Sequence, residues 1–363
     1  MKTFLVPVAL LVWAQVAFTS PSPTRTPPDS PQSFQQVLSE YAKENHFNGT
    51  ILVQQHGKTI YDASFGMANV QFAVPNTNAT KYRIASITKL FTSVLIMQLH
   101  DDKKLDLNEP IKTYLPNYKG EGTAKVTMFN LLTATSGIES NEKDAHADDV
   151  PAMYAKAYTT DELLGQFCSG KLEHEPGKVW NYNNGDYVIL GKIIEAIYKK
   201  PYEAVLQEKI LDSLQMTHTG MSSMTKVVPD LADVYWVNES TRAIENNPPI
   251  YFENYYAAGG LYSNAEDLLA FANALYGNRL IQPASLEAIL QPFLSRYGLG
   301  IWVYDKQVGG KTIRMQERQG AIWGIRTRLV HIPDEDITII LLSNIQTANM
   351  DDMQNEILTI LVN

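Results

Sequence analysis

The sequence predicts a mixed α/β (α+β) fold, in which one antiparallel sheet is built from strands at both ends of the chain and a mostly helical region is inserted between them. Segments rich in strand formers lie near the two ends, whereas the middle holds long apolar segments typical of helices. The chain has 363 residues and is 45% hydrophobic, which is enough for a large core. A cleft between sheet and helices is the expected place for a ligand site.

The first 33 residues are expected to lie outside this fold. Lys2 and an apolar stretch over 4–18 resemble a secretory signal peptide, assigned to residues 1–19. Cleavage fits either after the triplet 12–14 or within 17–20, and an uncleaved anchor is the alternative. Residues 20–33 carry five prolines and predict an extended linker. The folded domain is therefore expected over 34–363, in a secreted or periplasmic protein with no stable membrane anchor after cleavage.

The strands are predicted in two groups. Near the N-terminus, residues 49–65 predict a hairpin whose turn is His56-Gly57. Near the C-terminus, apolar or alternating segments punctuated by Gly309-Gly310 and Pro333-Asp334 predict four strands, over 299–304, 312–316, 326–331 and 337–342. A closing helix is expected over 350–361.

The helices occupy the region of about 86–290. The strongest prediction is the apolar segment 84–100. Four further helices are expected over 161–168, 187–198, 265–276 and 284–290.

Composition excludes several classes of function. A net charge of −9 argues against a nucleic-acid partner. The seven histidines show no spacing suited to a metal, and no Gly-rich phosphate loop or Gly-x-Ser-x-Gly elbow is present, so no cofactor is expected. Cys168 is the single cysteine and cannot form an intrachain disulfide. Asn48, Asn78 and Asn238 match the glycosylation acceptor pattern, which matters only in a eukaryotic source.

Ser86 and Lys89 form the first candidate for catalysis. Positions i and i+3 share one face of a helix, so the lysine can act as the base that a serine nucleophile needs. Burial among apolar neighbours would favour the neutral amine. The alternative is a helix-capping serine with a surface lysine. The same pattern recurs at 140–143 and 223–226, so context must decide.

Tyr182 and Asn184 form the second candidate. A tyrosine hydroxyl beside a lysine can relay protons, and an asparagine can orient the lysine and bind a substrate amide. The Tyr-x-Asn pattern also occurs at 262–264 and 276–278, where a helix cap and a helix end are expected instead.

In their order along the chain, these pieces resemble the serine β-lactamase and penicillin-binding-protein superfamily, in particular the branch of class C β-lactamases, D-alanyl-D-alanine carboxypeptidases and esterases. The resemblance extends from Phe47 to Asn344. It rests on the opening hairpin 47–68, the nucleophile motif 82–89 (YRIASITK), the middle segments 111–116 and 131–138, the Tyr-x-Asn segment 175–184, and the segments 258–263 and 341–344.

The resemblance implies a β-lactamase/transpeptidase-like fold and assigns roles to the candidate residues. Ser86 would be the nucleophile, with Lys89 and Tyr182 as its proton acceptors. Asn184 would hold Lys89 and the substrate amide. The backbone amides of Ser86 and Ala321 would bind the oxyanion.

The family's third motif, Lys-Thr-Gly or His-x-Gly, is matched best by Arg318-Gln319-Gly320. Arg318 would then grip a substrate carboxylate, and Gly320 would let the substrate approach closely. A solvent-facing Arg318 is the alternative. Trp323 is expected to shape the pocket rim. Ala134 stands where many relatives carry histidine, which we interpret as a change in packing.

These observations predict a secreted serine hydrolase that forms an acyl-enzyme on Ser86 and acts on an amide, β-lactam or ester. The substrate is expected to be a small molecule or peptide, such as a β-lactam or a peptidoglycan fragment, as in a β-lactamase or D-Ala-D-Ala carboxypeptidase. The alternatives are a broad carboxylesterase on the same fold and a non-catalytic sensor of wall fragments.

Overall fold

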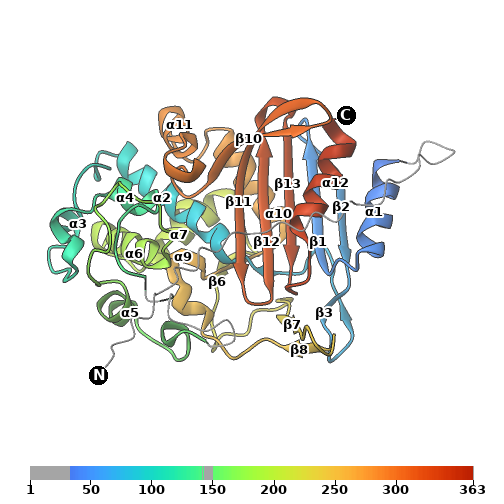
Figure 1. Cartoon of the computed structure of the whole chain (residues 1–363), viewed down its shortest axis with the longest axis horizontal. Coiled ribbons are helices and arrows are strands. Elements are labelled where there is room, and N and C mark those ends of the chain that lie inside the picture. The colour runs from blue at the N-terminus through green and yellow to red at the C-terminus, as the bar shows by residue number, and fades with distance from the viewer. Residues whose placement is uncertain (1–32, 141, 143–149, 363) are drawn as a thin grey trace, which may run out of the picture. The chain divides into compact units, whose positions relative to one another are not determined.

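Six antiparallel strands form the main sheet of the computed structural model, in the order β10-β11-β12-β13-β1-β2 (Figure 1). The structure describes residues 33–140, 142 and 150–362, so the predicted signal peptide and linker lie outside the described residues. The strands are β1 (Gly49–Gln55), β2 (Lys58–Phe65), β10 (Trp302–Val308), β11 (Lys311–Ile322), β12 (Ile325–Ile332) and β13 (Ile337–Ser343). The sheet therefore unites both ends of the chain, as predicted.

The centre of the sheet is buried on both faces. β1 pairs with β13 from Gly49 opposite Ser343 to Gln55 opposite Ile337. Alternate side chains point to opposite faces of a strand. Ile339 and Leu341 join one apolar cluster, whereas Ile340 and Leu342 join the other. This division explains why 337–342 reads as an unbroken apolar run.

Helices cover the two faces of the sheet. α1 (Phe34–Glu44) and α12 (Met350–Val362) pack on one face, where they contact each other and the strands β2, β10 and β12. α10 (Ala265–Tyr276) packs against β1 and β13 from the other side. The predicted helices 265–276 and 350–361 are confirmed, whereas α1 was not predicted.

The helical region lies on the β10–β11 side of the sheet (Figure 1). It contains α2 (Thr88–Asp101), α3 (Ile111–Tyr114), α4 (Met128–Leu132), α5 (Thr160–Phe167), α6 (Asn184–Tyr198), α7 (Tyr202–Leu206), α8 (Asp212–Leu214), α9 (Tyr256–Gly259) and α11 (Pro283–Leu290). Short strands accompany these helices: β3 (Met67–Asn69), β4 (Val74–Pro75), β5 (Tyr82–Arg83), β6 (Gly220–Met221), β7 (Tyr235–Val237), β8 (Ile244–Asn246) and β9 (Leu261–Ser263). Within the described ranges, no helix is both long and apolar enough to span a bilayer.

The predicted helix 84–100 is the central element of this region, but its first turn differs from the prediction. Residues Ala85–Ile87 form a separate 3₁₀ turn, η1, and the α-helix begins at Thr88. Nearly all side chains of α2 are buried, and Phe91 stacks on Phe271 of α10 with ring centroids 3.8 Å apart. α2 thus fixes η1 firmly against the sheet.

Candidate active site

Ser86 lies in η1, where the helical region meets β11. The preceding residue, Ala85, has φ of 47°, a conformation that an L-residue adopts only under constraint. Two hydroxyls hold this turn, because Thr327 Oγ1 donates to Ile84 O at 2.9 Å and Thr88 Oγ1 donates to Ala85 O at 2.7 Å. Ser86 itself is nearly buried, with 9% of its surface exposed. The strained turn therefore sets the position of the Ser86 hydroxyl.

Lys89 approaches Ser86 from the first turn of α2. Its Nζ lies 3.2 Å from Ser86 Oγ and donates to Asn184 Oδ1 at 2.6 Å and to Ala258 O at 2.7 Å. The side chain is completely buried, and burial lowers the pKa of Lys89 to about 8, with the positive charge of Arg318 acting in the same direction. A lysine with this pKa can accept a proton near neutral pH.

Tyr182 reaches the same hydroxyl from the segment before α6. Its OH donates to Ser86 Oγ at 2.8 Å. Burial alone would raise the pKa of Tyr182, but the positive charges of Arg318 and Lys89 lower it to about 8. The segment is anchored by Asn181, whose amide donates to Ala134 O at 2.8 Å. Two groups with lowered pKa thus meet at one serine hydroxyl.

Arg318 lies beneath the site, which corrects the expectation that it grips a substrate carboxylate. It is completely buried, so the solvent-facing alternative is also wrong. Its Nε donates to Ser86 O at 2.6 Å, and its two terminal nitrogens donate to Tyr182 OH at 2.6 Å and to Tyr297 OH at 2.7 Å. The planar guanidinium of Arg318 therefore links the backbone of η1 to the hydroxyls of Tyr182 and Tyr297 within the protein.

Asn184 contacts Lys89 as expected, but its amide nitrogen is not free for substrate. Nδ2 donates to both carboxylate oxygens of Glu142, at 2.9 and 3.0 Å. The hydroxyl of Tyr154 also donates to Glu142. The asparagine therefore connects Lys89 to the half-buried carboxylate of Glu142, and this contact corrects its expected bond to a substrate amide.

Gly320 serves a packing role that differs from the predicted one. A Cβ at this position would lie 2.5 Å from Ile84 O and 2.4 Å from Thr327 Oγ1. The missing side chain lets β11 approach the backbone of η1, whereas the close approach of a substrate stays a prediction. The next residue, Ala321, is exposed.

Trp323 lies in the turn between β11 and β12. Its ring contacts that of Trp236 edge-on, with centroids 6.3 Å apart, and its carbonyl accepts a hydrogen bond from Arg326. The side chain is half-buried.

An aromatic wall around Tyr182 and Arg318 was missed by the sequence analysis. Trp302 stacks parallel to Tyr182, and the guanidinium carbon of Arg318 lies 5.1 Å from the Trp302 ring centroid. Trp180 contacts both Tyr182 and Tyr297. Trp180 stands in the Tyr-x-Asn segment 175–184, but no motif marks Tyr297 or Trp302, because they come from separate segments that only the fold brings together.

The arrangement can perform acyl transfer. It unites a hydroxyl, two proton acceptors and a cation in a buried site, where charges act strongly. In the described part of the chain, no group of three or more His, Cys, Asp or Glu side chains is placed to hold a metal.

The comparisons with known proteins agree with this geometry. The chain is 28% identical to PbpX of Bacillus subtilis (strain 168), which is named as a penicillin-binding protein, over 90% of this chain and 78% of that one. Two solved structures share the fold. D-amino acid amidase of Ochrobactrum anthropi SV3 matches with a TM-score of 0.74 and 21% identity, over 89% of this chain and 96% of that one. EstCE1 is described as a hydrolase with promiscuous acyltransferase activity. It matches with a TM-score of 0.76 and 18% identity, over 90% of this chain and 97% of that one.

A family model described as Beta-lactamase matches residues 34–363, which is most of the chain. The chain therefore belongs to the beta-lactamase family and is a serine hydrolase.

Proposed function

We propose that this protein hydrolyses amide or ester bonds through an acyl-enzyme on Ser86. One observation carries the proposal: Ser86 Oγ lies within hydrogen-bond distance of both Lys89 Nζ, at 3.2 Å, and Tyr182 OH, at 2.8 Å. A nucleophile within reach of an activating base is the signature of covalent catalysis.

In the acylation step, the Lys89–Tyr182 pair in its deprotonated form accepts the Ser86 proton. Oγ attacks the substrate carbonyl carbon, and the carbonyl oxygen becomes an oxyanion. Tyr182 then returns a proton to the leaving amine or alcohol, the carbon–heteroatom bond breaks, and the acyl group stays on Oγ. In the second step, the same pair removes a proton from water, whose oxygen attacks the acyl carbon. The bond between the acyl carbon and Oγ then breaks, the pair returns the proton to Oγ, and the acid and free Ser86 are released.

The oxyanion would be held by the backbone amides of Ser86 and Ala321. The pairing of β11 with β10 ends at Glu317 opposite Trp302, so β11 continues past that point toward η1 without β10 beside it. Packing of Gly320 against Ile84 O brings this part of β11 next to Ser86. This approach of β11 to η1 supports the proposal that the Ala321 amide completes an oxyanion hole.

Because Arg318 is buried, a substrate carboxylate needs a different anchor. A fully buried guanidinium with three protein acceptors is poorly suited to bind a carboxylate from solvent. Arg326 stands opposite Ala321 in the register of β11 and β12 and is half-buried, with one nitrogen donating to two backbone carbonyls. We propose that Arg326 holds the carboxylate of a β-lactam or of a D-peptide, and that a neutral ester needs no such anchor.

The substrate would be met outside the cell, because the signal-like N-terminus predicts a secreted or periplasmic protein. Small β-lactams, peptidoglycan fragments and simple esters are the candidate substrates. The family branch that the sequence resembles supports this range, as do the names of the two structural neighbours, an amidase and a hydrolase with promiscuous acyltransferase activity.

Parallel turnover of nitrocefin, a p-nitrophenyl ester and a D-alanyl-D-alanine peptide tests the proposal. We expect hydrolysis of at least one of them, and a loss on the order of 10⁴-fold or more in Ser86→Ala. Arg326→Ala should reduce hydrolysis of the carboxylate-bearing substrates more than that of the ester. Binding without turnover of any of the three would instead favour a non-catalytic sensor, and equal losses in Arg326→Ala would remove the anchor role.

A further inference from the structure

Asn184 presents its side-chain oxygen to Lys89, and a carboxylate on its other side fixes this orientation. Lys89 Nζ donates to Asn184 Oδ1 at 2.6 Å, while Asn184 Nδ2 donates to the two carboxylate oxygens of Glu142, at 2.9 and 3.0 Å. A turned amide would bring its oxygen against the carboxylate, where two acceptors would face each other. Glu142 therefore determines which end of the amide faces the lysine.

This orientation directs the lone pair of Lys89 in its neutral form, which has two N–H bonds and one lone pair. The acceptors Asn184 Oδ1 and Ala258 O, at 2.6 and 2.7 Å, take the two N–H groups. The lone pair is then left for Ser86 Oγ at 3.2 Å, which is the direction that proton transfer from the serine requires.

Glu142 is held in turn by Tyr154. The hydroxyl of Tyr154 donates to Glu142, and its ring stacks on that of Tyr255 with centroids 3.8 Å apart. Burial and the Glu142 carboxylate raise the pKa of Tyr154 well above its ordinary value, so its hydroxyl stays protonated and able to donate. The contacts to Glu142 thus come from donors, which suits a carboxylate.

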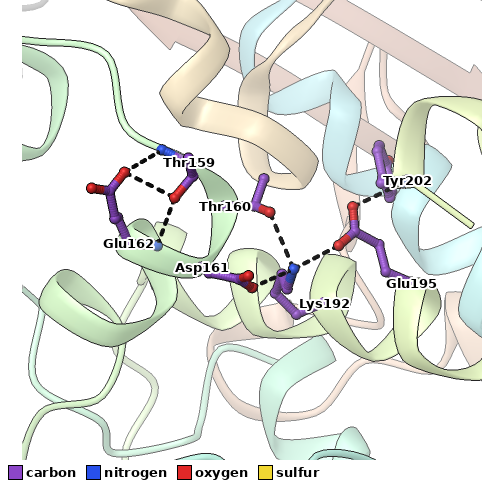
Figure 2. A network of polar contacts seen from close by, with 7 residues as sticks. All are labelled: Thr159, Thr160, Asp161, Glu162, Lys192, Glu195 and Tyr202. Carbon is purple, nitrogen blue, oxygen red and sulfur yellow. Dashed lines mark hydrogen bonds and ion pairs between the residues drawn. The ribbon is translucent and has the colours of Figure 1, made fainter. Parts of the chain in front are cut away.

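The helix α6, which begins at Asn184, is fixed by contacts that do not involve this carboxylate (Figure 2). Lys192 of α6 joins Asp161 of α5 at 2.7 Å, and Glu195 of α6 accepts from Tyr202 N of α7 at 3.0 Å. Because these bonds already hold the helix, the bond to the carboxylate is left to set the side chain of Asn184.

Glu142 also brings a negative charge to the lysine. Within the described chain, the ionisable side chains that face Lys89 are Tyr182, Tyr187, Asp186, Arg318 and Glu142. Burial raises the pKa of Asp186 well above its ordinary value and so disfavours its charged form. Burial lowers the pKa of Lys89, the charge of Arg318 lowers it further, and the charge of Glu142 opposes both.

We infer that Glu142 is a positioning residue for the hydrolysis, which holds Asn184 in the orientation that directs the lone pair of Lys89 to the nucleophile. Its negative charge also opposes the positive charge of Arg318 at the catalytic pair. The inference rests on the acyl-enzyme chemistry proposed above. Glu142 acts through Asn184, and not on Ser86 itself.

Glu142→Gln removes the charge but keeps an oxygen that can accept from Asn184 Nδ2, and the Tyr154 hydroxyl can turn to accept from the new amide nitrogen. For a neutral p-nitrophenyl ester, the fall of kcat/KM at low pH should move to lower pH than in the wild-type protein. The reason is that loss of the negative charge lowers the pKa of Lys89 further. Loss of the Arg318 charge would move it the other way.

Glu142→Ala removes the acceptor as well as the charge. Asn184 can then turn its NH₂ group to the lone pair of Lys89 and draw it away from Ser86. At the pH of highest activity, kcat should be about tenfold or more below that of Glu142→Gln, as expected when a hydrogen bond to a charged group is lost. Thermal unfolding shows whether each variant is folded, and Glu142→Gln decides alone if Glu142→Ala is not.

Glu195→Gln is the matched control, because it makes the same change in a largely buried glutamate that binds Lys192 and Tyr202 N. It lies roughly 16 Å along α6 from Asn184, at 1.5 Å for each residue. It should lower the thermal stability but leave kcat and the pH profile unchanged, and a purely structural Glu142 would behave in the same way.

The charge on Lys89 is also followed without turnover, by NMR titration of protein with carbon-13-labelled lysine, in which the signal lost in Lys89→Met identifies the residue. The midpoint should be lower in Glu142→Gln than in the wild-type protein. Absence of turnover with this shift present would contradict the acyl-enzyme proposal and leave the charge relation intact. An unchanged midpoint, an unmoved pH profile in Glu142→Gln, an equal movement in Glu195→Gln, or equal kcat in folded Glu142→Ala and Glu142→Gln would overturn the role of Glu142.

Discussion

Ser86 and the three side chains around it form one electrostatic unit. Lys89 and Tyr182 both reach its hydroxyl, and Arg318 binds its carbonyl and the hydroxyl of Tyr182. The pKa of Lys89 and that of Tyr182 are both lowered to about 8. Because these groups interact directly, they titrate as a pair, and the activity reports the state of the pair.

Arg318→Met should move the pH dependence of hydrolysis. The arginine charge lowers the pKa of Tyr182 and of Lys89, so its removal raises both. In the wild-type protein, kcat/KM should fall as the pH drops below about 8. In Arg318→Met, this fall should begin at higher pH, measured on a neutral ester.

Arg318→Lys is the matched control, because it keeps the positive charge. In this variant, the fall of kcat/KM at low pH (the acid limb of the pH profile) should stay near its wild-type position. An unchanged limb in Arg318→Met would show that the arginine does not set the pKa of the pair. In Arg318→Met, hydrolysis of a carboxylate-bearing substrate and of a neutral ester should fall by the same factor. In Arg326→Ala, hydrolysis of the carboxylate-bearing substrate should fall more.

Single residues of the site could be found from the sequence only where a motif marks them. Ser86, Lys89 and Tyr182 stand in short patterns with recognisable neighbours, and the structure brings them together. The inward orientation of Arg318 depends on Tyr297 and Trp302, which no spacing rule connects to it. Its position was predictable, but its contacts were not.

At the scale of elements, the site depends on how closely β11 approaches η1. Gly320 allows this approach, and the hydroxyl of Thr327 on the neighbouring strand fixes Ile84 O. The nucleophile turn is thus clamped between a strand and the buried helix α2.

Gly320→Ala should push η1 away from β11, because its Cβ would meet a backbone oxygen at 2.5 Å. We expect a destabilisation of about 1–3 kcal/mol, typical of overpacking, together with a lower kcat. Urea unfolding and turnover of a p-nitrophenyl ester measure the two effects.

Gly165→Ala in α5 is the control, since a Cβ there meets nothing within 4 Å. It should leave turnover unchanged and stabilise the helix by about 0.5–1 kcal/mol. If Gly320→Ala and Gly165→Ala had the same effect on the free energy of unfolding and on turnover, the packing role of Gly320 would be contradicted.

The long elements were predictable because their apolar patterns are strong: α10 has helical apolar periodicity, and β13 is an unbroken apolar run rich in strand formers. The boundary between η1 and α2 was not, because a 3₁₀ turn and the first turn of an α-helix share the same local pattern. α1 escaped prediction because its short apolar face, with Leu38 and Ala42 buried, gains its stability from the sheet it covers.

At the scale of the whole molecule, the sheet connects the chain ends, and the site lies where the sheet meets the helical region. The distribution of strand-like segments predicted a single sheet built from both ends of the chain, but it did not predict the strand order. Pairing of β1 with β13 joins residues nearly 300 positions apart, so sheet and site should form together.

The stability of the folded protein should rise between about pH 8 and pH 10 through this site. The folded-state pKa of Lys89 and that of Tyr182 are both about 8, whereas the unfolded values are 10.5 and 10.0. In this window the unfolded state binds more protons, so the free energy of unfolding increases with pH.

Urea unfolding of the wild-type protein and of Lys89→Met/Tyr182→Phe at several pH values tests this expectation. Titratable groups away from the site contribute equally to both proteins, so the difference reports the pair together with its neighbours Tyr187 and Tyr297. The wild-type protein should gain stability relative to the variant as the pH rises through the window. A constant difference would contradict the lowered pKa values.

The central claim is that Ser86 becomes acylated, and mass spectrometry of the protein after reaction with a penicillin or a fluorophosphonate tests it most directly. The account predicts one covalent adduct that maps to the peptide containing Ser86 and is absent in Ser86→Ala. Because Lys89 helps to remove the Ser86 proton, Lys89→Met should form the adduct far more slowly than the wild-type protein. No adduct with either reagent, or an adduct that persists in Ser86→Ala, would contradict the account.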